Sequence, residues 1–435
     1  MARVVVIGGG AAGIGAARTL LKSGFDVVLL EASARIGGNC TGVEVADAAG
    51  NVHSVDAGVS DFNRATFTEF TRLVEELGLP TQPIRSDVSF VSAQGHAIWS
   101  HRQGRWRAHA ADFDVEQVTA EIEIFRERAM EVLAEPYYTG WTTEQYLDQL
   151  GLSTAFRTYY LYPRASGCFP TPDVDPRDLE IRSLVRFWQI HGLVGRTRAD
   201  RRTIVGGMHR YPRVWRRWFL ERGGTLRCRT RVLGVARGPR GVTIHAVGPQ
   251  GRRSRLDADH VFFATHASQA LSMLDAPTLR ERVVLSSFRA RWAQVVVHRS
   301  PQPFVGSAPD TWGAFNYVVA SQAPLRMRPT ITFHANRLAS VAPSVPPVFV
   351  TLNPHVDPPP RSVIRRGEFL HPVARATSEQ HSIATIQGRQ RTWFAGAYRA
   401  EPFVHESALC SGIQAACALV DFEAGERLAH AIVAA

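Results

Sequence analysis

Three glycines near the start of the chain have the spacing of a phosphate-binding turn. They are Gly8, Gly10 and Gly13, in a G-x-G-x-x-G pattern. The apolar run Arg3–Ile7 before them predicts a buried strand, and the helix that follows would begin at Ala11 and Ala12. The first glycine permits a tight turn, the second lets backbone approach a pyrophosphate, and the third lets the helix lie close to the strand. The N-terminus of this helix would offer N–H donors to phosphate oxygens.

A carboxylate stands where a dinucleotide site needs one. The helix is expected to end at Gly24, residues 26–30 form a second apolar run, and Glu31 follows at its C-terminal end. A carboxylate there can accept both hydroxyl groups of an adenosine ribose. A glycine-rich turn in an ordinary strand–helix–strand unit is the alternative interpretation, but strand, glycines, helix, strand and acid are all in register. We therefore predict an α/β fold with a Rossmann-type nucleotide-binding domain.

A second glycine-rich bend indicates which nucleotide is bound. After Glu31 the sequence reads ASARIGGNC, an R-x-G-G-N arrangement that an NAD domain does not need. It resembles the R-x-G-G element of the flavin-containing amine oxidase superfamily, which includes phytoene desaturases and protoporphyrinogen oxidases. The resemblance implies FAD as the cofactor, with contacts in this segment from Ala32, Arg35, Gly37, Gly38 and Asn39. For Arg35 a solvated surface charge is the alternative.

The resemblance covers essentially the whole chain. The matching motifs are DAGVSDFNRATF, TIVGGMHRYP, ATHASQAL, FNYVVA, HANRL, FVTLNP and the closing FAGAY…HES, which are most similar to a bacterial group of NAD/FAD-binding, amine-oxidase-like proteins. The further FAD contacts that it implies are Gly58, Val59, Val232, Thr265, Gly396, Ala397, His405, Glu406, Ser407 and Ala408. The N-terminus of a C-terminal helix, residues 406–420, would face the flavin pyrimidine. Small residues on one face of this helix would let it approach the cofactor closely.

The expected pocket beside the flavin departs from that of the bacterial group. Where the group commonly ends in Gly-Tyr-Gly-Phe-His-Glu-Asp, this chain reads EPFVHES. We expect His405 to lie closest to the chemistry, as a partner of flavin O2 or as an acid or base, because its unperturbed pKa suits both roles. A structural histidine is the alternative. The further candidates are Tyr317 and Tyr398 for catalysis, and Asn316 and Arg399 for substrate binding.

Two absences in the sequence bear on the reaction. Many amine oxidases place a lysine near flavin N5, but the only lysine here, Lys22, falls in the first helix. Amine oxidation of that type is therefore disfavoured. No cysteine directly precedes the closing FAGAY strand, so we expect FAD to be bound without a covalent bond.

Element patterns predict two discontinuous lobes. Residues 1–87, 201–284 and 385–435 would form the FAD-binding domain, and residues 88–200 and 285–384 an α+β substrate domain with helices and an antiparallel sheet. Within the second lobe we expect a long helix from Asp114 to Glu135 and another from Tyr146 to Tyr160, with a break at Pro163.

Composition restricts the partners. The net charge is +11, but the basic residues are spread along the chain and are almost all arginine, which favours solvated faces over nucleic-acid binding. Such a field can still attract anionic substrates. Five scattered cysteines without a C-x-x-C pair indicate neither disulfides nor a metal site. We expect no transmembrane segment, no signal peptide and a cytoplasmic location.

The function that these features favour is that of an FAD-dependent oxidoreductase. As an oxidase, dehydrogenase or desaturase, it would take a hydride from a C–C or C–N unit of a small-molecule, acyl-type or carrier-bound substrate, anionic ones included. Two alternatives remain open at this point. One is a redox-neutral double-bond isomerase, and the other is a non-catalytic flavin-binding protein.

Overall fold

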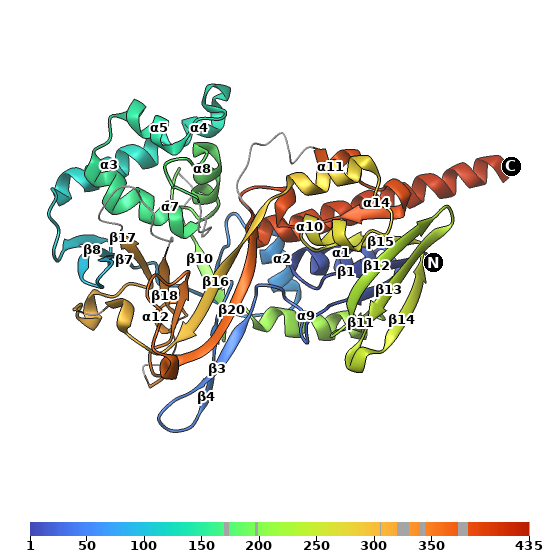
Figure 1. Ribbon diagram of the computed structural model, residues 1–435, viewed down its shortest axis with the longest axis horizontal. Coiled ribbons are helices and arrows are strands. Elements are labelled where there is room, and N and C mark those ends of the chain that lie inside the picture. The colour runs from blue at the N-terminus through green and yellow to red at the C-terminus, as the bar shows by residue number, and fades with distance from the viewer. Residues whose placement is uncertain are drawn as a thin grey trace.

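The computed structural model describes residues 1–168, 174–195, 199–304, 306–319, 330–339, 341, 344–372 and 382–434. Figure 1 shows two lobes side by side, with the long strands β16 (Ala290–His298) and β20 (Val363–Pro372) between them. The lobe at the right in that view contains both ends of the described chain. The lobe at the left contains most of the helices of residues 115–190.

A five-stranded parallel sheet is the centre of the first lobe. In spatial order its strands are β11 (Thr225–Arg227), β2 (Asp26–Leu30), β1 (Arg3–Ile7), β15 (His260–Phe263) and β21 (Thr392–Phe394). Each described neighbour pair is parallel, with Val5 opposite Val28 on one side and Val261 on the other. Parallel strands are buried on both faces, which explains the continuous apolar runs in the sequence.

Helices cover both faces of the parallel sheet. On one side Val4 and Val6 pack with α1 (Ala11–Lys22), α9 (Arg210–Glu221) and α14 (His405–Ala434). On the other side Val5 and Ile7 pack with α10 (Ala267–Met273), α11 (Leu279–Ser287) and the antiparallel sheet of β12 (Arg231–Gly238), β13 (Gly241–Val247) and β14 (Arg253–Ala258). This is the doubly covered arrangement of a Rossmann-type domain.

An eight-stranded sheet forms the floor of the second lobe. Its spatial order is β20, β16, β19 (Phe349–Leu352), β18 (Ile331–His334), β17 (Phe315–Val319), β7 (Val88–Ser92), β8 (Ala97–Arg102) and β9 (Arg105–Ala108). The sheet is not purely antiparallel as expected, because β7 and β17 run parallel where the two separate segments of the lobe meet. The predicted domain boundaries themselves stay a prediction.

Smaller elements connect the lobes. They are the hairpin β3 (Gly42–Ala46) and β4 (Val52–Asp56), the small sheet of β5 (Phe62–Asn63), β10 (Arg201–Ile204) and β6 (Thr81–Pro83), and the helices α2 (Thr68–Glu76) and α12 (Ala335–Leu338). The helical layer on the eight-stranded sheet consists of α3 (Val115–Arg128), α4 (Glu131–Ala134), α5 (Thr143–Leu150), α6 (Thr154–Phe156), α7 (Tyr162–Cys168) and α8 (Ile181–Ile190). Aromatic side chains of both layers form one core.

Three predicted helices differ from the observed ones. The helix expected over residues 114–135 is capped by Asp114, ends at Arg128 and is followed by the separate α4. The helix expected over residues 146–160 stops at Leu150, because Gly151 takes the left-handed conformation with a φ of 64°. The C-terminal helix is longer than expected and reaches Ala434.

The expected break at Pro163 is absent. A π-helical turn, Arg157–Leu161, leads directly into α7, and Pro163 lies in the first turn of α7. A proline inside a helix leaves the carbonyl four residues earlier without its usual N–H partner. Here that carbonyl belongs to Tyr159, and the Trp99 indole donates a hydrogen bond of 3.0 Å to it. A tertiary hydrogen bond from Trp99 thus replaces the helical hydrogen bond that Pro163 cannot donate.

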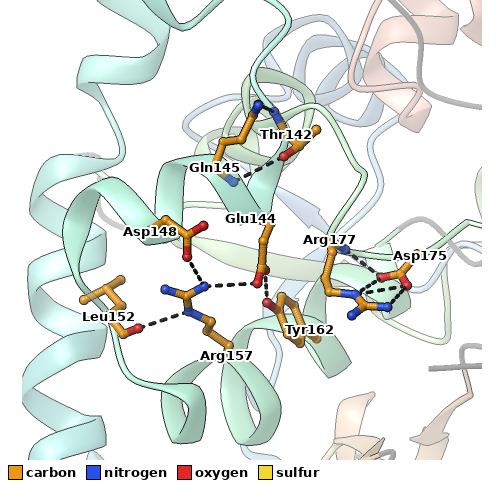
Figure 2. Close-up of polar contacts among 9 residues, drawn as sticks. All are labelled: Thr142, Glu144, Gln145, Asp148, Leu152, Arg157, Tyr162, Asp175 and Arg177. Atoms are coloured by element: carbon orange, nitrogen blue, oxygen red, sulfur yellow. Dashed lines mark hydrogen bonds and ion pairs between the residues drawn. The ribbon is translucent and has the colours of Figure 1, made fainter. Parts of the chain in front are cut away.

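An arginine fixes this wide turn against α5. Figure 2 shows Arg157 between Glu144 and Asp148, with Nη1 at 3.1 and 2.5 Å from their carboxylates. Its Nε also donates to the carbonyl of Leu152 at 3.0 Å. The Tyr162 hydroxyl donates to Glu144 as well. These contacts hold the start of α7 and so set the orientation of the residues that follow on it.

Candidate functional site

The first glycine turn is shaped by backbone contacts that exclude side chains. Gly8 has a φ of 104°, and its N–H donates to Leu30 at the end of β2 at 2.8 Å. A Cβ at Gly13 would lie 1.9 Å from the carbonyl oxygen of Gly8. Helix α1 therefore starts directly against the end of β1, with Gly10 as its N-cap and Ala11 and Ala12 in its first turn.

The second glycine bend lies against the first. Gly37 donates to the carbonyl of Gly9 at 2.7 Å, and a Cβ at Gly38 would lie 3.2 Å from the Cα of Gly10. Both Gly37 and Gly38 have positive φ angles, 113° and 56°. The two segments leave a backbone-lined space that side chains would fill. This fits a phosphate-bearing cofactor, which needs close approach to N–H groups at a helix N-terminus.

Glu31 is held at the end of β2. Its carboxylate accepts hydrogen bonds from the N–H of Gly9 at 2.7 Å and of Ser33 at 2.8 Å. The Ser33 hydroxyl donates at 2.7 Å, which leaves one of about four acceptor sites of the carboxylate for a ribose hydroxyl. Ala32 is exposed beside it. The carbonyl of Glu31 accepts from Thr230 at 2.9 Å, which brings Val232 on β12 close to the same end of the sheet.

The predicted cofactor residues Thr265 and Gly396 lie close to the first glycine turn, although they are distant from it in the sequence. Thr265 follows β15, and its methyl group would be 3.1 Å from a Cβ at Gly8. Its carbonyl oxygen would be 3.2 Å from a Cβ at Gly396. Ala397 follows in the same turn. The structure thus gathers Gly8, Thr265 and Gly396 at the carboxyl ends of β1, β15 and β21.

The segment around Gly58 pairs with the end of the second bend. A Cβ at Gly58 would lie 1.9 Å from the carbonyl oxygen of Asn39, and Val59 donates to that oxygen at 3.2 Å. Gly58 itself is exposed. Its exposed backbone is compatible with a flat ring beside it, and the flavin contact of Gly58 stays a prediction.

Two arginines face the same region. Arg35 is exposed, and Arg365 on β20 donates to the Thr41 hydroxyl at 2.7 Å. Burial, and next the charge of Arg35, lower the pKa of Arg365. An anionic group between these guanidinium groups would relieve that repulsion, which fits a diphosphate.

His405, at the start of α14, lies in a buried contact with α2 and α9. Its Nε2 is 2.8 Å from the Tyr211 hydroxyl, and its ring meets the Phe70 ring edge-on at 5.0 Å. Burial lowers its pKa to about 4, so the imidazole is neutral at pH 7. It can offer a hydrogen bond there, but it is a weak base.

The side chain of Glu406 serves α2 rather than a cofactor. Its carboxylate accepts from the N–H groups of Glu69 at 2.8 Å and Phe70 at 2.9 Å, in the first turn of that helix. An acid at a helix N-terminus satisfies donors that have no partner within the helix. This engagement leaves the backbone of Glu406 for its predicted cofactor contact.

The small residues of α14 were expected on a face that approaches the cofactor. In the structure this face packs on α1 instead. A Cβ at Gly412 would lie 2.0 Å from the carbonyl oxygen of Ala12, and a Cβ at Gly15 would lie 2.5 Å from that of Leu409. The small residues permit backbone contact between two helices. Ser411 also accepts a hydrogen bond of 2.9 Å from the N–H of Gly396.

Three predicted pocket residues have other environments. Tyr398 is 2 % exposed and packs against Phe288 in the core below α10 and α11. Arg399 donates to the carbonyls of Phe394 and Ser411, both at 3.2 Å, and so ties β21 to α14. The amide of Asn316 is engaged on both ends, with Gly313 and the Thr332 carbonyl. These contacts occupy the three side chains in the described structure, and their roles in catalysis and substrate binding stay predictions.

The side chain of Tyr317 points into the core between the eight-stranded sheet and its helical layer. It stacks on Phe90 with ring centroids 5.6 Å apart and packs against α7, where a Cβ at Gly167 would lie 2.7 Å from its Cε1. Burial raises its pKa to about 12, although Arg164 lowers it. Sequence reasoning missed Arg164, whose signal is a charged residue within the apolar stretch YYLYPRASG.

A small cavity joins Gly58 to this face of the sheet. Its volume is about 20 Å³, and it is lined by Asp56, Gly58, Ser60, Phe333, Ala335, Leu338, Ala339 and Val350. Asp56 is engaged elsewhere, because it accepts from the N–H groups of Met208 and His209 and from the His209 ring at 2.6 Å. On the side of the sheet the cavity is lined by the apolar residues Phe333 and Val350.

No helix in the described ranges has the length and apolar character that a bilayer crossing requires. The same residues hold no cluster of three His, Cys, Asp or Glu side chains suited to a metal ion.

Comparison with known proteins agrees with this geometry. The model of a family described as flavin containing amine oxidoreductase matches residues 11–298, more than half of the chain. A putrescine oxidase solved with putrescine has a TM-score of 0.65 at 14 % identity, and the match covers 97 % of this chain and 99 % of that one. Cyclohexylamine oxidase from Brevibacterium oxydans IH-35A gives the same four values.

A third solved structure, from Exiguobacterium sp. 255-15, is named provisionally as a protoporphyrinogen oxidase. It has a TM-score of 0.67 at 15 % identity, and the match covers 96 % of this chain and 98 % of that one. At such identities the solved structures show a shared fold.

Proposed function

The chain belongs to the family of flavin-containing amine oxidoreductases, and from this premise we propose that it takes a hydride from a C–C or C–N unit of a small or acyl-type substrate. It is an FAD-dependent oxidoreductase. When bound, the flavin accepts the hydride and passes the electrons to an acceptor such as oxygen. The observation that carries the proposal is the contact between the bends at Gly10 and Gly38, next to Glu31.

The residues of the first lobe would hold the cofactor. N–H groups at the start of α1 would bind the diphosphate, Glu31 the adenosine ribose, and Arg35 diphosphate or ribityl oxygens. The backbone of Gly58 would lie beside the flavin ring. The N-terminus of α14, at Ser407 and Ala408, would favour negative charge on the flavin pyrimidine.

His405 and Tyr317, two of the predicted site residues, are neutral at pH 7. Burial sets the pKa of His405 at about 4 and that of Tyr317 at about 12. We therefore propose that they donate hydrogen bonds and orient the substrate, rather than take up its proton. Lys22 is engaged with Glu76 at 2.7 Å, which supports a reaction without a lysine beside the flavin.

Anaerobic mixing of the oxidised protein with candidate substrates tests this function. We would use putrescine, cyclohexylamine and a series of straight-chain carboxylates, and follow the flavin absorbance. Lasting bleaching with one of them supports an oxidoreductase. A changed product with oxidised flavin would point to the isomerase instead, and tight FAD binding that dithionite reduces, without turnover of any compound, to a non-catalytic protein.

A further inference from the structure

Arg164 is a buried cation in the helical layer above the eight-stranded sheet. It is 8 % exposed, and its guanidinium lies 5.0 Å from the ring centroid of Tyr160 and 5.1 Å from that of Trp188. These aromatic contacts favour a cation in a desolvated position. They also leave the edges of the guanidinium, where its N–H groups are, for polar partners.

A hydroxyl group is a polar partner of Arg164. Its Nη1 donates to the Tyr160 hydroxyl at 2.6 Å, and the Tyr317 ring packs against the same helix, where a Cβ at Gly167 would lie 2.7 Å from its Cε1. Its Nε is buried and has no hydrogen-bond partner within the described ranges.

No carboxylate among the described residues forms an ion pair with Arg164. The nearby Arg201 has its own partner, Asp61, at 2.8 Å. Arg164, Arg201 and Asp61 together therefore carry one net positive charge. Burying such a charge without an anion costs several kcal/mol, which a bound anion would offset.

We propose that Arg164, Tyr160 and Tyr317 form a subsite that binds the carboxylate group of the substrate. A guanidinium edge matches a carboxylate in geometry, and each phenol can turn its proton toward the same anion. This inference rests on the proposed function, because it assigns the subsite to the substrate of the flavin reaction. It adds a substrate class, namely acids.

The register of the sheet relates the subsite to the expected flavin position. Phe333 lines the cavity beside Gly58 and pairs with Phe315 on β17. Tyr317 lies two residues further along the same face, so it is the diagonal neighbour of Phe333, at about 7–8 Å. The carboxylate would thus bind several bonds away from the reacting carbon, which is expected beside the flavin at Gly58, and short acids would not reach both positions.

Calorimetric titration of the oxidised holoprotein tests the subsite without turnover. The probes are straight-chain carboxylates from butanoate to decanoate and the matched primary amides. We expect carboxylates to bind at least 10-fold more tightly than their amides, with affinity that rises with chain length. Equal affinity for a carboxylate and its amide in the unmodified protein would overturn the proposal.

Substitution then locates the charge. Arg164→Met should remove at least 10-fold of the carboxylate affinity and leave the amide affinity unchanged, and Arg164→Lys should restore part of it. Arg213→Met, on the exposed side of α9, is the matched control and should bind like the unmodified protein. A retained carboxylate preference in Arg164→Met would contradict the assignment.

Two milder variants cover the case in which Arg164→Met does not fold. Tyr160→Phe and Tyr317→Phe each remove one hydroxyl and should weaken carboxylate binding several-fold, whereas unchanged affinity in both would count against the subsite. FAD content and reduction by dithionite, measured on the same samples, separate a failure of this inference from a failure of the proposed function.

Discussion

Replacing Gly10 by alanine separates cofactor binding from folding. Gly10 has a φ of −74°, which alanine adopts without strain, and the nearest atom to an added Cβ is the Cα of Gly38 at 3.9 Å. The folded protein thus has room for the methyl group. Gly→Ala at a compatible position stabilises a protein by about 0.4–1 kcal/mol, because it restricts the unfolded chain.

The same methyl group would occupy the space expected for the diphosphate. A Cβ projects about 1.5 Å from its Cα, so a phosphate oxygen at hydrogen-bond distance from the α1 N–H groups would be displaced by about 1 Å. Losing one charge-assisted hydrogen bond costs about 1.5–3 kcal/mol. We therefore expect FAD affinity to fall by roughly 10-fold to 100-fold while stability of the apoprotein is unchanged or slightly raised.

The assay is FAD titration of the apoprotein by fluorescence quenching, together with thermal unfolding of the apoprotein. Gly367→Ala, on β20, is the matched control, because nothing lies within 4 Å of its added Cβ. It should leave FAD affinity unchanged and change stability by no more than Gly10→Ala does. Normal FAD affinity in Gly10→Ala would refute the placement of the diphosphate between the two bends.

Four further outcomes are expected. Gly13→Val should abolish FAD binding and also lower stability, because its Cβ alone would lie 1.9 Å from a carbonyl oxygen, and a variant with normal FAD content would contradict the close strand–helix contact. Arg35→Ala should weaken FAD binding several-fold in calorimetry, whereas unchanged affinity would make it a solvated charge. His405→Ala should shift the flavin reduction potential with little loss of FAD, and unchanged potential and reduction rate would make the residue structural. Burial sets the pKa of the fully buried His298 at about 4, so the unfolded chain takes up a proton between pH 6.5 and 4 that the folded protein does not. The contribution of His298 to stability should fall by roughly 3 kcal/mol as pH falls through this window, and His298→Gln should reduce the pH dependence of stability by that amount, whereas an unchanged pH dependence would contradict this.

The first lobe was predictable because local signals decide its structure. The run Arg3–Ile7 and the strand Asp26–Leu30 have the predicted bounds, and the glycine spacing predicted where α1 begins. A buried parallel strand is apolar throughout, and a turn that excludes Cβ atoms requires glycine at fixed positions. Both requirements concern residues that are close together in the sequence, so a local pattern is enough to predict them.

The helix ends of the second lobe depended on contacts between distant residues. Pro163 would break an isolated helix, but Trp99, more than sixty residues earlier, bonds the carbonyl that it leaves free. No local pattern contains that partner. The bond of Glu406 to the first turn of α2 is of the same kind, since it joins residues that are 336 positions apart.

Asn316 and Tyr317, both candidates for the pocket beside the flavin, lie on opposite faces of β17. Successive side chains of a strand point to opposite faces, so two neighbours on β17 cannot line the same pocket. Tyr317 faces the helices, and Asn316 bonds within the sheet on the other side. Alternation alone would have limited the prediction to one of them.

Arg164 could not be recognised for a different reason, which concerns helix phase. In a chain with 50 basic residues a single arginine attracts notice only if it falls on a buried helix face. That face is predicted by placing residues at 3.6 per turn along the helix. The π turn Arg157–Leu161 has more residues per turn, so every later residue lies at a different angle around the helix than predicted. The turn is held by Arg157 between two acids of α5, so the phase of α7 is a product of tertiary ion pairs. The contacts of Arg157 with Glu144 and Asp148 therefore have two effects. They make a helical wheel misplace Arg164, and they orient α7 so that its guanidinium points toward Tyr160 and Tyr317.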